Sequence, residues 1–226
     1  MKTLWYIMIF SVLPNINKCS NLDQLGDESR NDIKKYIQEL YQNITGFGID
    51  ATESAAISNQ GGAPTYGEIT YEGAQELFKN LDLTKEDIFY DLGCGVGKLV
   101  VQAYFTPIKK AVGIELSPTR YQHAQAVKQK VVQKPIDGKV LEFHKQDIAQ
   151  YPLDDATIIF MCSTCFSDDL MKKLSDNIRK LKDGTKIITL KRLPDHKDFV
   201  LIKQYTLPMT WSSSTPVYQY ELKHKH

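Results

Sequence analysis

From residue 70 onward, the hydrophobic positions switch repeatedly between helical spacing and short continuous runs. Thr70 can cap a helix in which Ala74, Leu77, Phe78 and Leu81 share one face. Further helical patterns cover residues 98–104, 117–132 and 167–181. Strand-like runs lie at residues 87–92, 111–116, 139–148, 156–162, 184–193, 199–205 and 216–222. This alternation predicts an α/β fold, in which a mainly parallel seven-stranded sheet carries helices on both faces.

The first 63 residues follow a different pattern. Residues 1–20 have a basic start and an apolar run over 4–13, which is the layout of a secretory signal peptide but too short to span a bilayer. Because no small-x-small cleavage site precedes Cys19, an uncleaved anchor, a buried helix or a misassigned start are alternatives. Residues 21–63 read as an extension of helix and loop, with helical spacing over 33–44. The glycine-rich stretch 46–69 is predicted to be a loop that serves as a lid.

The charges of the chain nearly cancel. Twenty-eight basic residues stand against 27 acidic ones, for a formal net charge of +1. No global field is therefore available to hold nucleic acid or an anionic membrane, and we expect no strong binding to either. The four cysteines are too few and too clustered for a disulfide scaffold, which indicates reduced thiols.

Three closely spaced glycines, Gly93, Gly95 and Gly97, follow the run at 87–92. A glycine-rich turn between a strand and a helix lets the backbone approach a ligand closely. The dinucleotide fingerprint G-x-G-x-x-G fails because position 98 is lysine, and the phosphate loop fails because Leu99 stands where a hydroxyl is required. The remaining pattern, D-x-G-x-G-x-G led by Asp91, resembles the first motif of the Rossmann-like class I S-adenosylmethionine (SAM) methyltransferases.

Polar or small residues also stand at the other predicted strand ends, where ligands of parallel sheets bind. Glu115 is placed to accept hydrogen bonds from both hydroxyls of a ribose, and Asp147 from an adenine amino group. Cys162 and Cys165 follow the next strand, where the reacting methyl group is expected. A lone acid is more often a helix cap or a solvated loop residue, and a C-x-x-C pair can be a redox dithiol. No second cysteine pair or nearby histidine completes a zinc set, so no metal site is predicted.

A longer stretch carries a more specific resemblance. Residues 65–105, which include Tyr66-Gly67-Glu68, are similar to the catalytic core of the disruptor-of-telomeric-silencing family of histone lysine methyltransferases. The segments "GIELSP", "GTKIITLKRL" and "MTWSSSTPVYQYEL" match in the same order, so that the resemblance covers residues 64–222. It implies a SAM-dependent methyltransferase domain over residues 64–226.

The resemblance also implies site residues. Tyr66 to Ile69 would form a loop over the cofactor, and Trp211 with Tyr218 or Tyr220 would line a channel for the substrate lysine, where Ser163 could orient the amine. The implied cofactor site consists of Tyr66, Gly67, Glu68, Ile69, Phe89, Tyr90, Asp91, Leu92, Gly93, Cys94, Gly95, Val96, Gly97, Lys98, Glu115, Asp147 and Ile148.

Two departures from the family pattern bear on the substrate. Cys162 and Ser163 stand where the family has an asparagine pair, and the long basic extension that holds family members on nucleosomal DNA has no counterpart. The leading hypothesis is a monomeric enzyme that methylates a protein lysine, with histone as the first candidate substrate. A non-histone lysine or a small amine is the alternative, and a redox or cofactor-binding module that uses Cys162 and Cys165 is a third. The signal-like start favours secretory or organellar targeting, whereas a histone substrate would require the nucleus.

Overall fold

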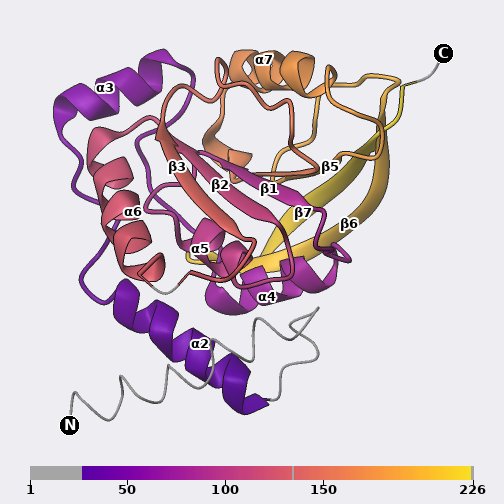
Figure 1. Ribbon diagram of the computed structural model, residues 1–226. Helices are drawn as coiled ribbons and strands as arrows, with labels where there is room; N and C mark the ends of the chain where they lie inside the picture. The colour runs from indigo at the N-terminus through magenta and orange to yellow at the C-terminus, as the bar shows by residue number, and fades with distance from the viewer. Residues whose placement is uncertain (1–26, 134, 225–226) are drawn as a thin grey trace, which may run out of the picture.

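The computed structural model describes residues 27–133 and 135–224 (Figure 1). The predicted signal-like segment at residues 1–20 lies outside the described residues. Across the described ranges, no helix has the length and apolar character needed to cross a membrane.

Helices and strands alternate along most of the chain, as the sequence predicts. The helices are α2 (Asp27–Leu40), α3 (Ala51–Asn59), α4 (Tyr71–Lys79), α5 (Lys98–Tyr104), α6 (Pro118–Val131), the 3-10 turn η2 (Ser163–Cys165) and α7 (Asp168–Ile178). The strands are β1 (Ile88–Leu92), β2 (Lys110–Glu115), β3 (Val140–Lys145), β4 (Ile158–Met161), β5 (Lys186–Thr189), β6 (Phe199–Met209) and β7 (Ser212–Leu222).

Side-chain caps fix where several of these helices begin. The hydroxyl of Thr70 accepts a hydrogen bond from Gly73 N at the start of α4, and Ser117 and Ser167 cap α6 and α7 in the same way. Pro118 occupies the first turn of α6, where its missing N–H costs nothing. The predicted starts of these three helices are confirmed.

The seven strands form one sheet in the order β3-β2-β1-β4-β5-β7-β6. Strands β1 to β5 pair in parallel, and β7 runs antiparallel to both β5 and β6. The predicted mainly parallel, seven-stranded sheet is confirmed. The order reverses between β1 and β4, and crevices for ligands open at the carboxyl ends of strands at such a point.

Helices cover both faces of the sheet (Figure 1). Phe89 points into the core beneath α2, α4, α5 and α6, whereas its neighbour Tyr90 points into the core beneath α7. Ile33, Ile37 and Leu40 of α2 belong to the first of these cores. The predicted extension at residues 21–63 therefore packs, over its described helix α2, in the same core as the glycine-turn helix α5.

The loop prediction for residues 46–69 is wrong in its middle, because helix α3 lies there. Asp50 caps α3 by accepting a hydrogen bond from Glu53 N at 2.8 Å, and Glu53 places an acid in the first turn. The spacing of Asp50 and Glu53 is a capping signal that the surrounding glycines and serines obscured. The C-terminal strands are also longer than predicted, because β6 and β7 form a continuous hairpin that turns at Thr210 and Trp211.

Candidate active site

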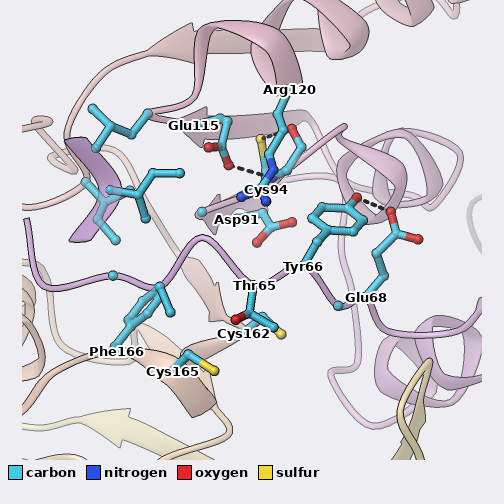
Figure 2. A pocket seen from close by; sticks show the side chains of 18 of the residues that line it. Thr65, Tyr66, Glu68, Asp91, Cys94, Glu115, Arg120, Cys162, Cys165 and Phe166 are labelled. Atoms are coloured by element: carbon cyan, nitrogen blue, oxygen red, sulfur yellow. Dashed lines mark hydrogen bonds between the residues drawn. The ribbon is translucent and has the colours of Figure 1, made fainter. Parts of the chain in front are cut away.

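A cavity of about 330 Å³ opens where the strand order reverses. Its walls come from the ends of β1 and β2, the glycine turn, the segment after β4 and the chain that leads from α3 to α4 (Figure 2). Twelve of the residues predicted for the cofactor line it, namely Tyr66, Gly67, Glu68, Ile69, Asp91, Gly93, Cys94, Gly95, Lys98, Glu115, Asp147 and Ile148.

The other predicted cofactor residues lie behind this wall. Phe89, Tyr90, Leu92 and Val96 are buried in the two cores and do not line the cavity. Gly97 is the cap residue of α5 in the left-handed conformation at φ 83°, and a Cβ added there would lie 2.5 Å from the ring of Phe143. These residues support the turn from behind the cavity wall, and their contact with a cofactor stays a prediction.

The Glu115 carboxylate closes the glycine turn onto β2. It accepts hydrogen bonds from Gly95 N and Ser117 N, each at 2.8 Å. Burial raises the pKa of Glu115, while these backbone N–H groups and the nearby Arg120 oppose the rise. Glu115 therefore holds the turn in shape and at the same time presents its carboxylate to the cavity.

Asp91 lies beside Glu115, but its carboxylate is less well satisfied by hydrogen bonds and neighbouring charges (Figure 2). Asp91 is 4% exposed, and its Oδ1 is buried without a hydrogen-bond partner among the residues that the structure describes. Burial, followed by the charges of Glu115 and Glu68, raises the pKa of Asp91 to about 8. A buried carboxylate of this kind calls for a cation, and the cavity that it lines is the place for one.

A chain of polar contacts borders the same cavity. The Tyr66 hydroxyl donates to Glu68, and Lys98 Nζ donates to the other carboxylate oxygen of Glu68 at 2.7 Å. The ammonium of Lys98 also lies 5.6 Å from the ring centre of Tyr41 at the end of α2. The contact with Tyr41 had no signal in the sequence, because 57 positions separate the two residues.

Asp147 and Ile148 line the cavity after β3. The Asp147 carboxylate accepts from Ala149 N at 2.8 Å and from the Gln150 side chain at 3.0 Å, so part of its role is to cap its own turn.

The predicted substrate-channel residues divide into two groups. Trp211 lines the cavity, is 46% exposed and packs so closely on Gly67 that a Cβ there would lie 2.5 Å from its ring. Tyr218 and Tyr220 do not line the cavity. Tyr220 is buried in the core beneath α7, and the Tyr218 ring lies 4.7 Å from the Arg192 guanidinium. The prediction of a channel tyrosine therefore has no support from this cavity and stays a prediction.

Ser163 also lies outside the cavity lining, and its predicted role at the amine stays a prediction. It is fully buried, its hydroxyl is 2.7 Å from the Thr189 hydroxyl, and it accepts from the backbone N–H groups of Leu190 and Lys191. Its role is to join the chain after β4 to the end of β5, and it does not face the cavity.

Cys162 and Cys165 both line the cavity and are free thiols. Burial, followed by the charge of Asp91, raises the pKa of Cys162 to about 12, which disfavours the reactive thiolate. Within the described residues, no three His, Cys, Asp or Glu side chains are grouped so that they could hold a metal ion.

Arg120 and Ile57 also line the cavity, although the sequence did not single them out. A lone arginine two positions after Pro118 carries no motif, and Ile57 belongs to the stretch predicted as loop.

Two solved methyltransferases have a similar fold. An RNA methyltransferase from Salinibacter ruber, in complex with S-adenosyl-L-homocysteine (SAH), has a TM-score of 0.51 and 19% identity, and the match covers 70% of this chain and 94% of that one. Magnesium protoporphyrin IX methyltransferase from Synechocystis PCC 6803, with bound SAM, has a TM-score of 0.50 and 14% identity over 88% of this chain and 99% of that one. The fold is that of the Rossmann-like class I SAM methyltransferases.

The family follows from the sequence match. A family model described as "Histone methylation protein DOT1" matches residues 51–209, and the chain belongs to this family. Two relatives are H3 lysine-79 specific histone-lysine N-methyltransferases. The one from Drosophila melanogaster is 30% identical over 140 residues, and the one from Caenorhabditis elegans is 32% identical over 147 residues. These matches cover 56% and 59% of this chain but only 7% and 15% of the relatives.

A third relative is a protein-lysine N-methyltransferase from Saccharolobus islandicus, which is 27% identical over 108 residues. This match covers 47% of this chain and 63% of that one.

Proposed function

We propose that this protein is a SAM-dependent N-methyltransferase that acts on lysine side chains of proteins, with histone as the leading substrate. One observation supports the proposal most strongly. Asp91 lines the cavity at the switch point of the sheet, and its buried Oδ1 has no hydrogen-bond partner among the described residues. The chain that carries this site belongs to the DOT1 family.

The residues around the cavity fit this cofactor. SAM carries an ammonium and a sulfonium, and its methyl group on sulfur is the group that a methyltransferase transfers. The Asp91 carboxylate is suited to the ammonium, because a cation there offsets the cost of burying the charge. Glu115 can accept from ribose hydroxyls while it keeps its two backbone donors, since a carboxylate has about four acceptor positions. Asp147 is assigned to the adenine side of the site.

The protein's contribution to methyl transfer is positioning and exclusion of water. A lysine amine must be neutral to act as a nucleophile, and an apolar wall penalises its ammonium form. Phe160, Cys162, Phe166 and Trp211 provide apolar or weakly polar surface in this cavity. Because Ser163 faces away, orientation of the amine falls to this wall, and no side chain has to act as a strong base in the displacement itself.

The identity of the substrate is the finer part of the proposal. The H3 lysine-79 specificity named for two relatives favours histone. The near-zero net charge, and the relative from Saccharolobus islandicus that is named only for protein lysine, favour a non-histone protein lysine as the second candidate. We expect the enzyme to act as a monomer.

The test is methyl transfer from labelled SAM. Purified protein is incubated with core histones, nucleosomes and a mixed protein extract in turn, and the labelled residue is identified by mass spectrometry. We expect label on the lysine of a protein. Trp211→Ala should lower kcat/KM for that substrate by about tenfold or more while SAH affinity stays unchanged, and Ile202→Ala, an exposed residue of β6, is the control. Label on a small amine alone, or on no acceptor at all, would contradict the proposal.

A further inference from the structure

Residues 46–64, which we call the strap, lie against helix α6 and lead into the cavity wall at Thr65 and Tyr66. Arg120 of α6 contacts both ends of the strap. Its Nε donates to Gly46 O at 2.9 Å, and its Nη2 donates to Pro64 O at 2.6 Å. One guanidinium therefore joins the beginning and the end of the strap.

The middle of the strap is joined to the same helix through Glu53. The Glu53 carboxylate accepts from the Ser117 hydroxyl and, at 2.5 Å, from the Thr119 hydroxyl. Thr119 N lies 3.3 Å from both carboxylate oxygens. Burial would raise the pKa of Glu53, but the hydrogen bonds from Ser117 and Thr119 outweigh it and lower the pKa, so these contacts favour the charged carboxylate. The first turn of α6 thus holds the strap at three points along its length.

Arg120 also fixes the ring of Tyr66. The guanidinium carbon lies 4.9 Å from the ring centre. The ring also packs against two glycines. A Cβ added to Gly46 would lie 2.0 Å from a ring carbon of Tyr66, and a Cβ added to Gly95 would lie 2.7 Å from one. Tyr66 is therefore packed between the strap, the glycine turn and Arg120, where its hydroxyl reaches Glu68 (Figure 2).

Arg120 also acts on the carboxylate of Glu115 in the predicted cofactor site. It lines the cavity although its residue is only 6% exposed, and its charge favours the ionised form of Glu115. Across the described residues, no carboxylate oxygen lies within ion-pair distance of its guanidinium. Its hydrogen bonds go to the two strap carbonyls from two different nitrogens, Nε and Nη2, a spacing that the guanidinium provides and the single Nζ of a lysine does not.

We propose that Arg120 is a positioning residue of the cofactor site, which clamps both ends of the strap and holds Tyr66 against the glycine turn. The proposal rests on the proposed function, since SAM is the ligand that the clamped wall would enclose. Lid motion of residues 46–69 stays a prediction, and the contacts of Arg120 are those that opening would break.

The test compares Arg120→Met and Arg120→Lys with the wild type. Arg192→Met is the matched control, because Arg192 also stacks on a tyrosine but lies outside the cavity. SAH affinity is measured by calorimetry, hydrogen exchange of residues 46–66 is measured without ligand, and KM is measured separately for SAM and for the protein substrate.

For Arg120→Met we expect at least about tenfold weaker SAH binding and a matching rise in the KM for SAM, with the KM for the protein substrate unchanged. Exchange of residues 46–66 should rise without ligand. Arg120→Lys keeps the charge near Glu115, but its single, shorter ammonium does not reproduce the separate Nε and Nη2 donors that reach Gly46 O and Pro64 O, so its SAH affinity should recover in part while strap exchange stays raised. Arg192→Met should match the wild type.

SAH affinity within twofold of the wild type, together with unchanged strap exchange in Arg120→Met, would overturn the proposal. If Arg120→Met does not fold, the Arg120→Lys variant is the test. Wild-type SAH affinity together with wild-type exchange of residues 46–66 in Arg120→Lys would show that Arg120 contributes only its charge, and would overturn the proposal. If the wild type itself binds no SAH, the proposed function fails, and the ligand-free exchange comparison still decides whether Arg120 clamps the strap.

Discussion

Asp91 and Glu115 end neighbouring parallel strands and border the same cavity, yet the protein satisfies them differently. Glu115 accepts two backbone hydrogen bonds at 2.8 Å, whereas Asp91 Oδ1 is buried and has no hydrogen-bond partner in the described part of the chain. The charge of Glu115 is the second cause, after burial, of the raised pKa of Asp91. The pair is therefore an unfavourable arrangement of the kind found where function opposes stability, and we expect a bound cation to relieve it.

The first prediction follows from Asp91. Its pKa is about 8 in the folded protein, against about 3.9 in an unfolded chain. Between these values the folded state keeps a proton that the unfolded state has released, so the contribution of Asp91 to stability is full below the lower value and is lost as pH rises toward 8. Asp91→Asn removes the cost of ionising this buried group and should therefore raise the melting temperature of the ligand-free protein. Because that cost grows as pH rises toward the folded pKa, the gain should be larger at about pH 8.5 than at about pH 6.

The same substitution should weaken SAH binding by roughly 10- to 100-fold, since it removes a charge-assisted contact of about 1.5–3 kcal/mol. Thermal unfolding and calorimetry measure the two effects, and Asp154→Asn, on an exposed acid, is the control. A destabilised Asp91→Asn protein at the higher pH would show that Asp91 is satisfied in a way that the unpartnered oxygen does not reveal.

The second prediction concerns Glu115. Glu115→Ala should weaken SAH binding by at least about tenfold, because it removes acceptors for the cofactor and also leaves Gly95 N and Ser117 N without their partner. Calorimetry is the measurement. Glu142→Ala on the adjacent strand β3, where the carboxylate pairs with Lys110 at 3.1 Å, should bind normally. Unchanged affinity in Glu115→Ala would remove this residue from the site.

The third prediction separates folding from catalysis at Ser163. Ser163→Ala leaves two buried N–H groups without an acceptor, which costs about 1–3 kcal/mol. For a chain of this size the melting temperature should fall by roughly 2–4 °C for each kcal/mol. The kcat of the folded fraction should stay unchanged, as in the exposed control Ser213→Ala. A loss of kcat without a loss of stability would support the hypothesis that Ser163 orients the substrate amine.

The fourth prediction concerns the two cavity thiols. Cys165→Ala should keep most of the activity, and titration with a thiol reagent should find no low-pKa cysteine pair, since burial raises the pKa of Cys162 to about 12. The wild type assayed with and without reductant is the comparison. Activity that depends on reductant in the wild type but not in Cys165→Ala would favour the redox hypothesis.

Much of the cofactor side of the site is local in sequence, and that is why it could be predicted. In a parallel sheet every strand ends at the same edge, so the acids at or just after the ends of β1, β2 and β3 converge without further information. Asp91, Glu115 and Asp147 were found in this way. The glycine turn was found from the D-x-G-x-G-x-G pattern, and the structure gives its physical reason, because few other residues adopt the left-handed backbone seen at Gly95.

The sequence by itself determined the alternation of strands and helices, the caps of α4, α6 and α7, and the acids at the strand ends, because these depend on neighbours within a few positions. Only the tertiary structure decided which side chains turn toward the cavity. Ser163 meets Thr189, and Arg120 meets Gly46 and Pro64, across long separations in the chain. Such contacts depend on how helices and strands pack in space. The pattern of residue types along one segment does not show which distant segment will pack against it.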